Sequence, residues 1–286
     1  MNRVVLKDIP LQPKPFPGLV PTIHRVFFGL FLLQFALVWT RVWLPQPPFG
    51  TAHWPEGLLV LLATATVLAS LTRQLPGQNV MLASIIIAFI ASAVETLGAL
   101  TGIPLFVHTN EVGPQLAPSL PWEMPLAWIV ALLSSRGVAR MMLRPWRNTP
   151  NYGFWLIGLT IFLVVLLDFG VEPFAGHLAS FWRWTPSRVR LDWHTASCVN
   201  FLGCAVTALL ILAFVTPTLI NKKPMTQPPP DYHPLIVWLL LNLLFATGTA
   251  AHQLWPAAIL TFTGSVVVMA LAVRGVQRQK TMEMPR

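Results

Sequence analysis

Long apolar stretches recur along the chain, and each is close to the length of a membrane span. A helix needs about 20 predominantly apolar residues to cross the hydrocarbon of a bilayer, and eight segments approach that length. The predicted spans are Val26–Trp43, Glu56–Leu71, Asn79–Gly102, Trp122–Leu143, Tyr152–Val171, Ser197–Ile220, Pro234–Trp255 and Pro256–Val273. The last two meet at a Trp-Pro joint, so they form either two helices or one kinked helix, with seven spans as the alternative count. The pattern predicts an all-α, polytopic transmembrane helix bundle.

The polar stretches indicate one bundle with two flanking segments. Residues 1–25 combine charges with five prolines, which predicts an extended cytoplasmic arm rather than a cleavable signal peptide. Residues 26–275 form the predicted bundle, and residues 276–286 form a basic cytoplasmic tail. The prolines of residues 228–230 predict a stiff spacer between the sixth and seventh spans. No internal repeat or separate soluble domain is apparent.

Composition supports the membrane assignment, and the distribution of basic residues predicts an orientation. Hydrophobic residues make up 55% of the 286 residues and charged residues only 10%, which is too little charge for a water-facing surface. The net charge is +9. Fifteen of the 19 Lys and Arg residues fall on one side of the predicted spans, so both termini are expected in the cytoplasm. The basic character therefore predicts membrane lipids as partners and argues against nucleic acid.

Two acidic residues fall inside predicted spans, where a carboxylate is costly and usually functional. Glu95 and Asp168 each lie 16 residues after the predicted cytoplasmic end of their span, or about 24 Å along a helix. The two acids are therefore expected at the same depth, in the outer half of the membrane. An acid in such an apolar setting can hold a proton at neutral pH, as a general acid requires.

Small residues surround Glu95 on its helical face. The positions three, four and seven residues away are Ala88, Ala91, Ser92, Gly98, Ala99 and Gly102. This stripe predicts either a slot for a slender substrate or close packing between helices, with Glu95 bound to a structural partner.

A second acid follows Asp168 on the same helical face. Glu172 lies four residues later, and Pro173 is expected to stop the helix. Two neighbouring carboxylates can divide the roles of acid and base. Alternatively, Glu172 lies in headgroup water and has no chemical role.

The connection after the fifth span contains Trp182 and Trp184, and Asn200 and Phe201 open the sixth span. Tryptophan is common at membrane interfaces without any catalytic role. Next to the acids, the π faces of these rings could instead stabilise a cation.

Other reactive residue types give weaker signals. Cys198 and Cys204 are about 9 Å apart along one helix, too far for a disulfide, and are expected in the core. The histidines lack the spacing of metal ligands, and neither a metal nor a cofactor is predicted. Arg136 and Arg140 are expected to extend toward lipid phosphate, outside the functional site.

Several short motifs follow one another along the chain. In the first half they are Glu95-Thr96-Leu97-Gly98, Thr101-Gly102-Ile103-Pro104, Gly113-Pro114-Gln115-Leu116 and Pro125-Leu126-Ala127-Trp128. In the second half they are Asp168, Glu172-Pro173, Trp182-Arg183-Trp184 and Asn200-Phe201-Leu202-Gly203. Taken in order, these motifs resemble the integral-membrane carotenoid biosynthesis family, which includes carotenoid 1,2-hydratases and bisanhydrobacterioruberin hydratases. The resemblance covers about residues 79–220.

The resemblance implies a cofactor-free hydro-lyase that adds water across the terminal 1,2 double bond of an acyclic carotenoid. Glu95 or Asp168 would donate the proton and the other would act as the base, while Glu172 would help to hydrate the reacting centre. The implied substrate-binding residues are Gly98, Thr101, Gly102, Trp128, Trp182, Trp184, Asn200 and Phe201. It also implies a prokaryotic cytoplasmic membrane, an acyclic carotenoid or related isoprenoid as substrate, and association with other carotenoid enzymes.

The chain departs from the family pattern at three places. The stretch Leu105–Asn110 is shorter and less aromatic than usual, Glu172 replaces an Asp, and Cys204 stands where the family often has Trp. A second class of function stays open at this point. A lipid or carotenoid carrier, or a proton-coupled transporter, would also need an apolar groove with intramembrane acids.

Overall fold

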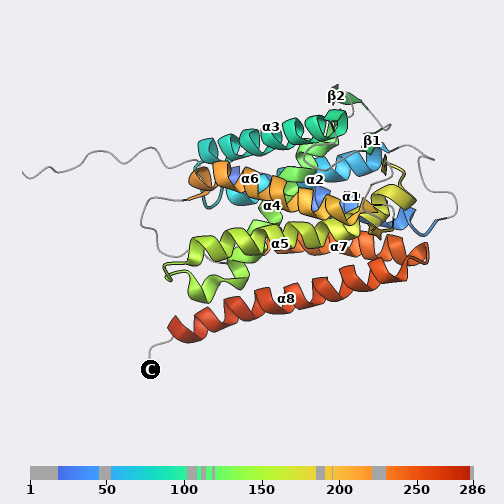
Figure 1. Ribbon diagram of the computed structural model, residues 1–286. Coiled ribbons are helices and arrows are strands. Elements are labelled where there is room, and N and C mark those ends of the chain that lie inside the picture. The colour runs from blue at the N-terminus through green and yellow to red at the C-terminus, as the bar shows by residue number, and fades with distance from the viewer. Residues whose placement is uncertain are drawn as a thin grey trace, which may run out of the picture.

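The computed structural model describes residues 19–44, 53–101, 108–110, 114–117, 120–184, 191–194, 196–220 and 230–283. Within this part of the chain, eight α-helices lie alongside one another as a bundle (Figure 1). They are α1 (Leu19–Arg41), α2 (Trp54–Leu71), α3 (Gly77–Thr101), α4 (Glu123–Met142), α5 (Tyr152–Pro173), α6 (Cys198–Val215), α7 (His233–Ala251) and α8 (Trp255–Glu283). The predicted all-α bundle is confirmed. The last two spans are separate helices, with Gln253 between them at a positive φ of 62°.

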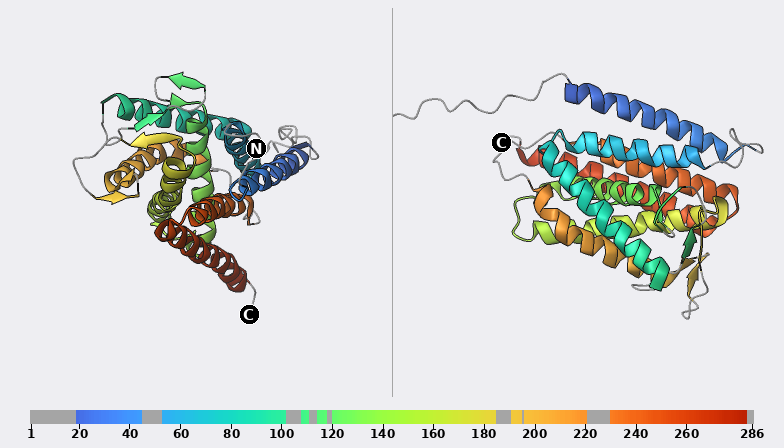
Figure 2. Two further views of the ribbon diagram at one scale, coloured as in Figure 1. Left: turned by 90° about the vertical axis from the view of Figure 1, so that its right-hand side faces the viewer. Right: turned by 90° about the horizontal axis from the view of Figure 1, so that it is seen from above.

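Helix α4 lies in the middle of the bundle. It packs against α2, α3, α5, α7 and α8, and the end-on view in Figure 2 shows the other helices arranged around it. Leu132 and Val138 of α4 are fully buried, as is Trp238 of the neighbouring α7. The core is therefore continuous along α4, and sites at its two ends are built on the same helices.

Seven helices in the described part of the chain are long and apolar enough to cross a membrane; α4 is not among them. Helix α4 carries Glu123, Arg136 and Arg140, and its neighbours enclose it. The outer helices instead expose large apolar side chains, such as Phe89 and Phe154, which are 72% and 79% exposed. Such side chains suit contact with lipid. The protein is an integral membrane protein, and the side on which its termini lie stays a prediction.

The ends of the bundle differ from the predicted segment boundaries. Helix α1 begins at Leu19, inside the predicted arm, and α8 continues to Glu283, through most of the predicted tail. Polar side chains in these helix ends are buried within the protein, as His24 and Gln279 show. A prediction from apolar content alone therefore makes these two helices too short, because it leaves out the polar residues at their ends. Residues 1–18 of the arm and residues 228–229 of the predicted spacer lie outside the described residues.

Three short strand pairs cover one end of the bundle. Strand β1 (His108–Asn110) pairs with β4 (Trp182–Trp184), with His108 opposite Trp184. The other pairs are β2 (Gln115–Ala117) with β3 (Leu120–Pro121), and β5 (Asp192–Trp193) with β6 (Ala196–Ser197). The β1–β4 pair joins the α3–α4 connection to the α5–α6 connection. These strands were not predicted, because each is only two or three residues long.

Helix α5 does not end in an abrupt stop at its proline. The α-helix ends at Pro173 as predicted, but the chain continues into a π-helical turn, Phe174–Leu178. Pro173 removes a donor only from its own position, so the backbone downstream can keep a helical course. The turn carries Phe174 inward and leads the chain to strand β4.

Candidate functional site

A cavity of about 250 Å³ lies at the end of the bundle that carries the strands. Helices α2 to α7 contribute its walls, which are mostly apolar side chains such as Val164, Leu167 and Leu241. Five carboxylic acids line it, and three of them, Glu95, Asp168 and Glu172, come from the interiors or far ends of α3 and α5. A space of this size and polarity suits an apolar group held next to a few polar atoms.

Glu95 is positioned by the central helix. Its side chain is only 7% exposed, and its Oε1 accepts a hydrogen bond of 2.8 Å from Nε1 of Trp128. Trp128 is itself 8% exposed and lines the cavity. A buried indole N–H requires an acceptor, so the pair fixes both the carboxyl group and the ring. The small-residue stripe had predicted either a slot beside Glu95 or close packing with a structural partner for this acid. In the structure Glu95 has such a partner, Trp128, and it also lines the cavity.

Asp168 and Glu172 lie one helical turn apart on α5 and are bridged by Asn200. The Nδ2 of Asn200 donates to Oε1 of Glu172 at 2.8 Å and lies 3.5 Å from Oδ2 of Asp168. Cys204, one turn after Asn200 on α6, also lines the cavity. Helices α5 and α6 therefore hold the two acids together, as the i, i+4 spacing on each helix permits.

Strand β4 supplies a second donor to Glu172. Nε1 of Trp182 lies 3.2 Å from Oε2 of Glu172, so each carboxylate oxygen accepts an N–H. Glu172 is 4% exposed, so it does not lie in headgroup water. Because β4 is paired with β1, the position of the Trp182 ring depends on the two long connections meeting over the cavity.

The structure brings together only some of the residues singled out in the sequence. Glu95, Asp168, Glu172, Trp128, Trp182 and Asn200 all line the cavity. Gly98 is buried in α3 but does not line it, and Thr101 is exposed, with its hydroxyl donating to the carbonyl of Leu97. Phe201 packs behind the site, stacked on Phe169 at 4.1 Å. Gly102 and the side chain of Trp184 lie outside the described residues.

Four further polar residues line the cavity: His53, Glu56, Glu123 and Cys204. Glu56 pairs with Arg41, whose Nε lies 3.5 Å from Oε1 of Glu56. Burial lowers the pKa of His53, and the nearby charge of Arg41 lowers it further, which favours a neutral imidazole. Glu56 and Glu123 stand in the first turns of their helices, where a sequence gives no sign of whether an acid faces inward. Cys204 is buried as predicted, and it lines the cavity.

The opposite end of the bundle differs from expectation at Arg136. This side chain is 7% exposed, so it does not extend to the membrane surface, and its Nη2 donates to the carbonyl of Leu219 at 3.2 Å. Helical spacing cannot tell a lipid-facing arginine from an inward-facing one when the whole helix is enclosed by others.

The cavity combines the parts needed to move a proton in an apolar space. Asp168 and Glu172 are connected through Asn200, and Glu95 lines the same cavity from α3. Trp128 and Trp182 place aromatic rings beside the acids. Among the described residues, no group of three His, Cys, Asp or Glu side chains is placed to hold a metal ion.

Comparison with protein families identifies a matching family. A family model described as "Carotenoid biosynthesis protein" matches residues 56–270, which include every acid of the cavity. Neither the curated proteins nor the solved structures give a match.

Proposed function

The chain belongs to the carotenoid biosynthesis protein family, and we propose that it hydrates the terminal 1,2 double bond of an acyclic carotenoid to give a tertiary alcohol. The observation that carries the proposal is the set of three acids, Glu95, Asp168 and Glu172, in one apolar cavity. The end group of such a polyene is a small branched hydrocarbon. The cavity supplies apolar contact for that group and acidic oxygens at its side.

The reaction needs one proton donor, one water and one base, and no net oxidation. Glu95 or Asp168 donates a proton to C2, and the π electrons of the double bond form the new C–H bond. The positive charge then lies on C1, a tertiary centre. Water adds to C1 through its oxygen and loses a proton to the second carboxylate. Proton exchange with water restores the acid, so the net change is the addition of one water.

Glu172 and Asn200 would hold the water. Asn200 donates to both acids of α5, so its amide stands between them, and Glu172 is fixed by two N–H donors. A carboxylate fixed in this way can accept a hydrogen bond from water and orient the oxygen toward C1. Positioning of this kind converts a bimolecular addition of water into an effectively unimolecular step.

The aromatic rings would stabilise the intermediate cation. The faces of Trp128 and Trp182 carry negative quadrupole charge, which attracts a cation within about 6 Å of the ring. Both indole N–H groups are already bonded to acids, so the rings cannot turn freely. The acids and the rings would thus act on the same charge.

The first test is pigment analysis in a host that makes lycopene. Expression of this chain should produce carotenoids heavier than the precursor by one water, about 18 Da, because the proposed reaction has no other product. A host with the empty vector is the control. Unchanged pigment, in membranes where the protein is present and folded, would contradict hydration. Carotenoid that co-purifies with the protein without a change in mass would favour the carrier.

A further inference from the structure

A second polar pocket lies at the end of the bundle opposite the acidic cavity. It has a volume of about 60 Å³ and lies among α2, α4, α5 and the residues leading into α7. A single water needs only about 10–15 Å³ by such a measure, so the pocket has room for several waters or one tetrahedral oxyanion. The hydration chemistry proposed above uses none of its residues.

Four arginines line this pocket: Arg136, Arg140, Arg144 and Arg147. They follow one face of α4 and the 3-10 turn after it, from Arg136, which is buried, to Arg147, which is exposed. The arginines thus form a path from the protein surface into the interior. Guanidinium groups in a fixed arrangement are the side chains best suited to bind phosphate oxygens.

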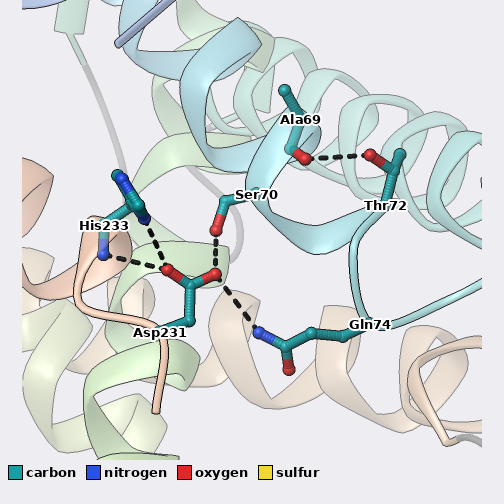
Figure 3. Close-up of polar contacts among 6 residues, drawn as sticks. All are labelled: Ala69, Ser70, Thr72, Gln74, Asp231 and His233. Carbon is teal, nitrogen blue, oxygen red and sulfur yellow. Dashed lines mark hydrogen bonds and ion pairs between the residues drawn. The ribbon is translucent and has the colours of Figure 1, made fainter. Parts of the chain in front are cut away.

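One carboxylate, Asp231, also lines the pocket, but both of its oxygens accept hydrogen bonds from groups other than the arginines. Its Oδ1 accepts from the backbone N and from Nδ1 of His233, at 3.1 and 2.7 Å. Its Oδ2 accepts from Ser70 and, at 3.2 Å, from Nε2 of Gln74 (Figure 3). Burial alone would raise the pKa of Asp231, but the hydrogen bonds from His233 and Ser70 outweigh it and lower the pKa to about 2.

Two of the arginines, Arg136 and Arg140, meet neutral acceptors instead of acids. Nη1 of Arg140 donates to Oε1 of Gln74 at 2.9 Å, and Arg144 donates to Gln279. Gln74 therefore stands between Arg140 and Asp231, receiving from one and donating to the other. Among the described residues, neither Arg136 nor Arg140 forms an ion pair with a carboxylate. Among the described residues that line the pocket, four are arginines and one is a carboxylate, so positive charge predominates there.

We propose that this pocket binds a phosphate group, carried either by a membrane lipid or by a small soluble anion. Buried cations without anionic partners are costly, and a bound anion removes that cost. The positive charges of Arg136 and Arg140, which have no carboxylate partner among the described residues, favour a phosphate over a neutral ligand. The mostly buried position of Arg136 and Arg140 distinguishes this pocket from a general attraction between basic surface residues and lipid.

The test uses the full chain, purified in a neutral detergent without phosphate, and the midpoint of thermal unfolding. Two additives separate the sources: micellar phosphatidylglycerol, with phosphatidylcholine as the zwitterionic control, and inorganic phosphate, with chloride at equal ionic strength. A ligand at one hundred times its Kd should raise the midpoint by about 5 °C. A rise with phosphatidylglycerol alone assigns a lipid headgroup, and a rise with inorganic phosphate assigns a soluble anion.

Two variants show whether the pocket is responsible. Arg140→Gln should lose most of the rise in the midpoint. Arg278→Gln should keep the rise, because it removes only an exposed arginine near the C-terminal end of α8. Arg144→Gln replaces Arg140→Gln if that variant does not fold. No rise with either additive would overturn the proposal. Equal losses in Arg140→Gln and Arg278→Gln would also overturn it, because they would indicate only general attraction to a basic surface.

Discussion

The two ends of the bundle carry opposite charges on the same helices. Helices α2, α4, α5 and α7 contribute to both the acidic cavity and the arginine pocket. Along α4, Trp128 of the cavity and Arg140 of the pocket are 12 residues apart, or about 18 Å. At one end, Glu95 and Glu172 accept from neutral N–H donors. At the other, Arg136 and Arg140 donate to neutral oxygens.

The difference indicates what each end is suited to receive. A carboxylate held by Trp and Asn can still attract a cation, and a guanidinium held by a carbonyl or an amide can still attract an anion. The acidic cavity therefore suits a reaction that passes through a carbocation. The arginine pocket suits a phosphate. The following changes test this contrast, starting with the largest expected effect.

The largest effect is expected from removing one acid of the cavity without changing its shape. Glu95→Gln and Asp168→Asn, made separately, should each lower hydration by about 10²–10⁴-fold, the usual contribution of a general acid or base. Product per folded protein, measured by chromatography in the lycopene host, is the readout. Asp192→Asn is the matched control, since Asp192 is an exposed residue of β5. Activity that survives both cavity substitutions would rule out the acid–base roles.

A change at the arginine end should act on stability. Asp231→Asn removes a carboxylate that accepts from Ser70, Gln74 and His233, and it should lower the free energy of unfolding by about 2 kcal/mol at neutral pH. Because the folded pKa of Asp231, about 2, is below the unfolded value near 3.9, its stabilisation is present above about pH 4. The difference from wild type should therefore shrink as the pH falls from about 4 to 2. Thermal unfolding across this range measures it, and a constant difference would contradict the account.

A smaller loss is expected from filling the space behind the acidic cavity. In Gly248→Ala the new Cβ would lie 2.6 Å from Cε2 of Phe174, a residue of the cavity wall. Overpacking of this kind should cost about 1.5 kcal/mol. Gly158→Ala is the control, because nothing lies within 4 Å of that position. The measurement is the midpoint of thermal unfolding of both variants. Equal midpoints for Gly248→Ala and Gly158→Ala would contradict the expected loss and show that Phe174 can move aside.

The smallest effect is expected at Thr101. The family resemblance implied that this residue binds substrate, but its side chain is exposed and does not line the cavity. Thr101→Val should keep hydration within about twofold of wild type, since a binding contact would be worth about 1 kcal/mol or more. A tenfold loss in the pigment assay would show that substrate extends beyond the cavity along α3.

Much of the acidic end could be predicted because periodicity and depth act together there. The i, i+4 spacing of Asp168 and Glu172 and the equal depth of Glu95 predicted neighbouring acids, and the described cavity contains all three. Spacing on one helix does not reveal the partner, so the hydrogen bonds from Trp128 and Asn200 became visible only in the structure. The same limit explains Gly98 and Phe201, which share helices with cavity residues but face neighbouring elements.

The arginine end was harder to predict because its signal is ambiguous in sequence. Basic residues near a span usually indicate the cytoplasmic side, and that interpretation suited Arg136 and Arg140. Their inward position depends on α4 being enclosed by five helices, which is a property of the packed bundle. Asp231 and Gln74 meet across 157 residues of chain, so no local pattern could place them together.

The most direct test of the acidic cavity is hydration in heavy water. Membranes containing the wild-type protein are supplied with an acyclic carotenoid in D₂O, and the product is returned to H₂O before mass and NMR analysis. Protonation at C2 by a carboxylic acid that exchanges with solvent predicts a product about 19 Da heavier than the substrate, with one deuterium fixed at C2. Carotenoid recovered at its original mass, or an alcohol without deuterium at C2, would contradict the account.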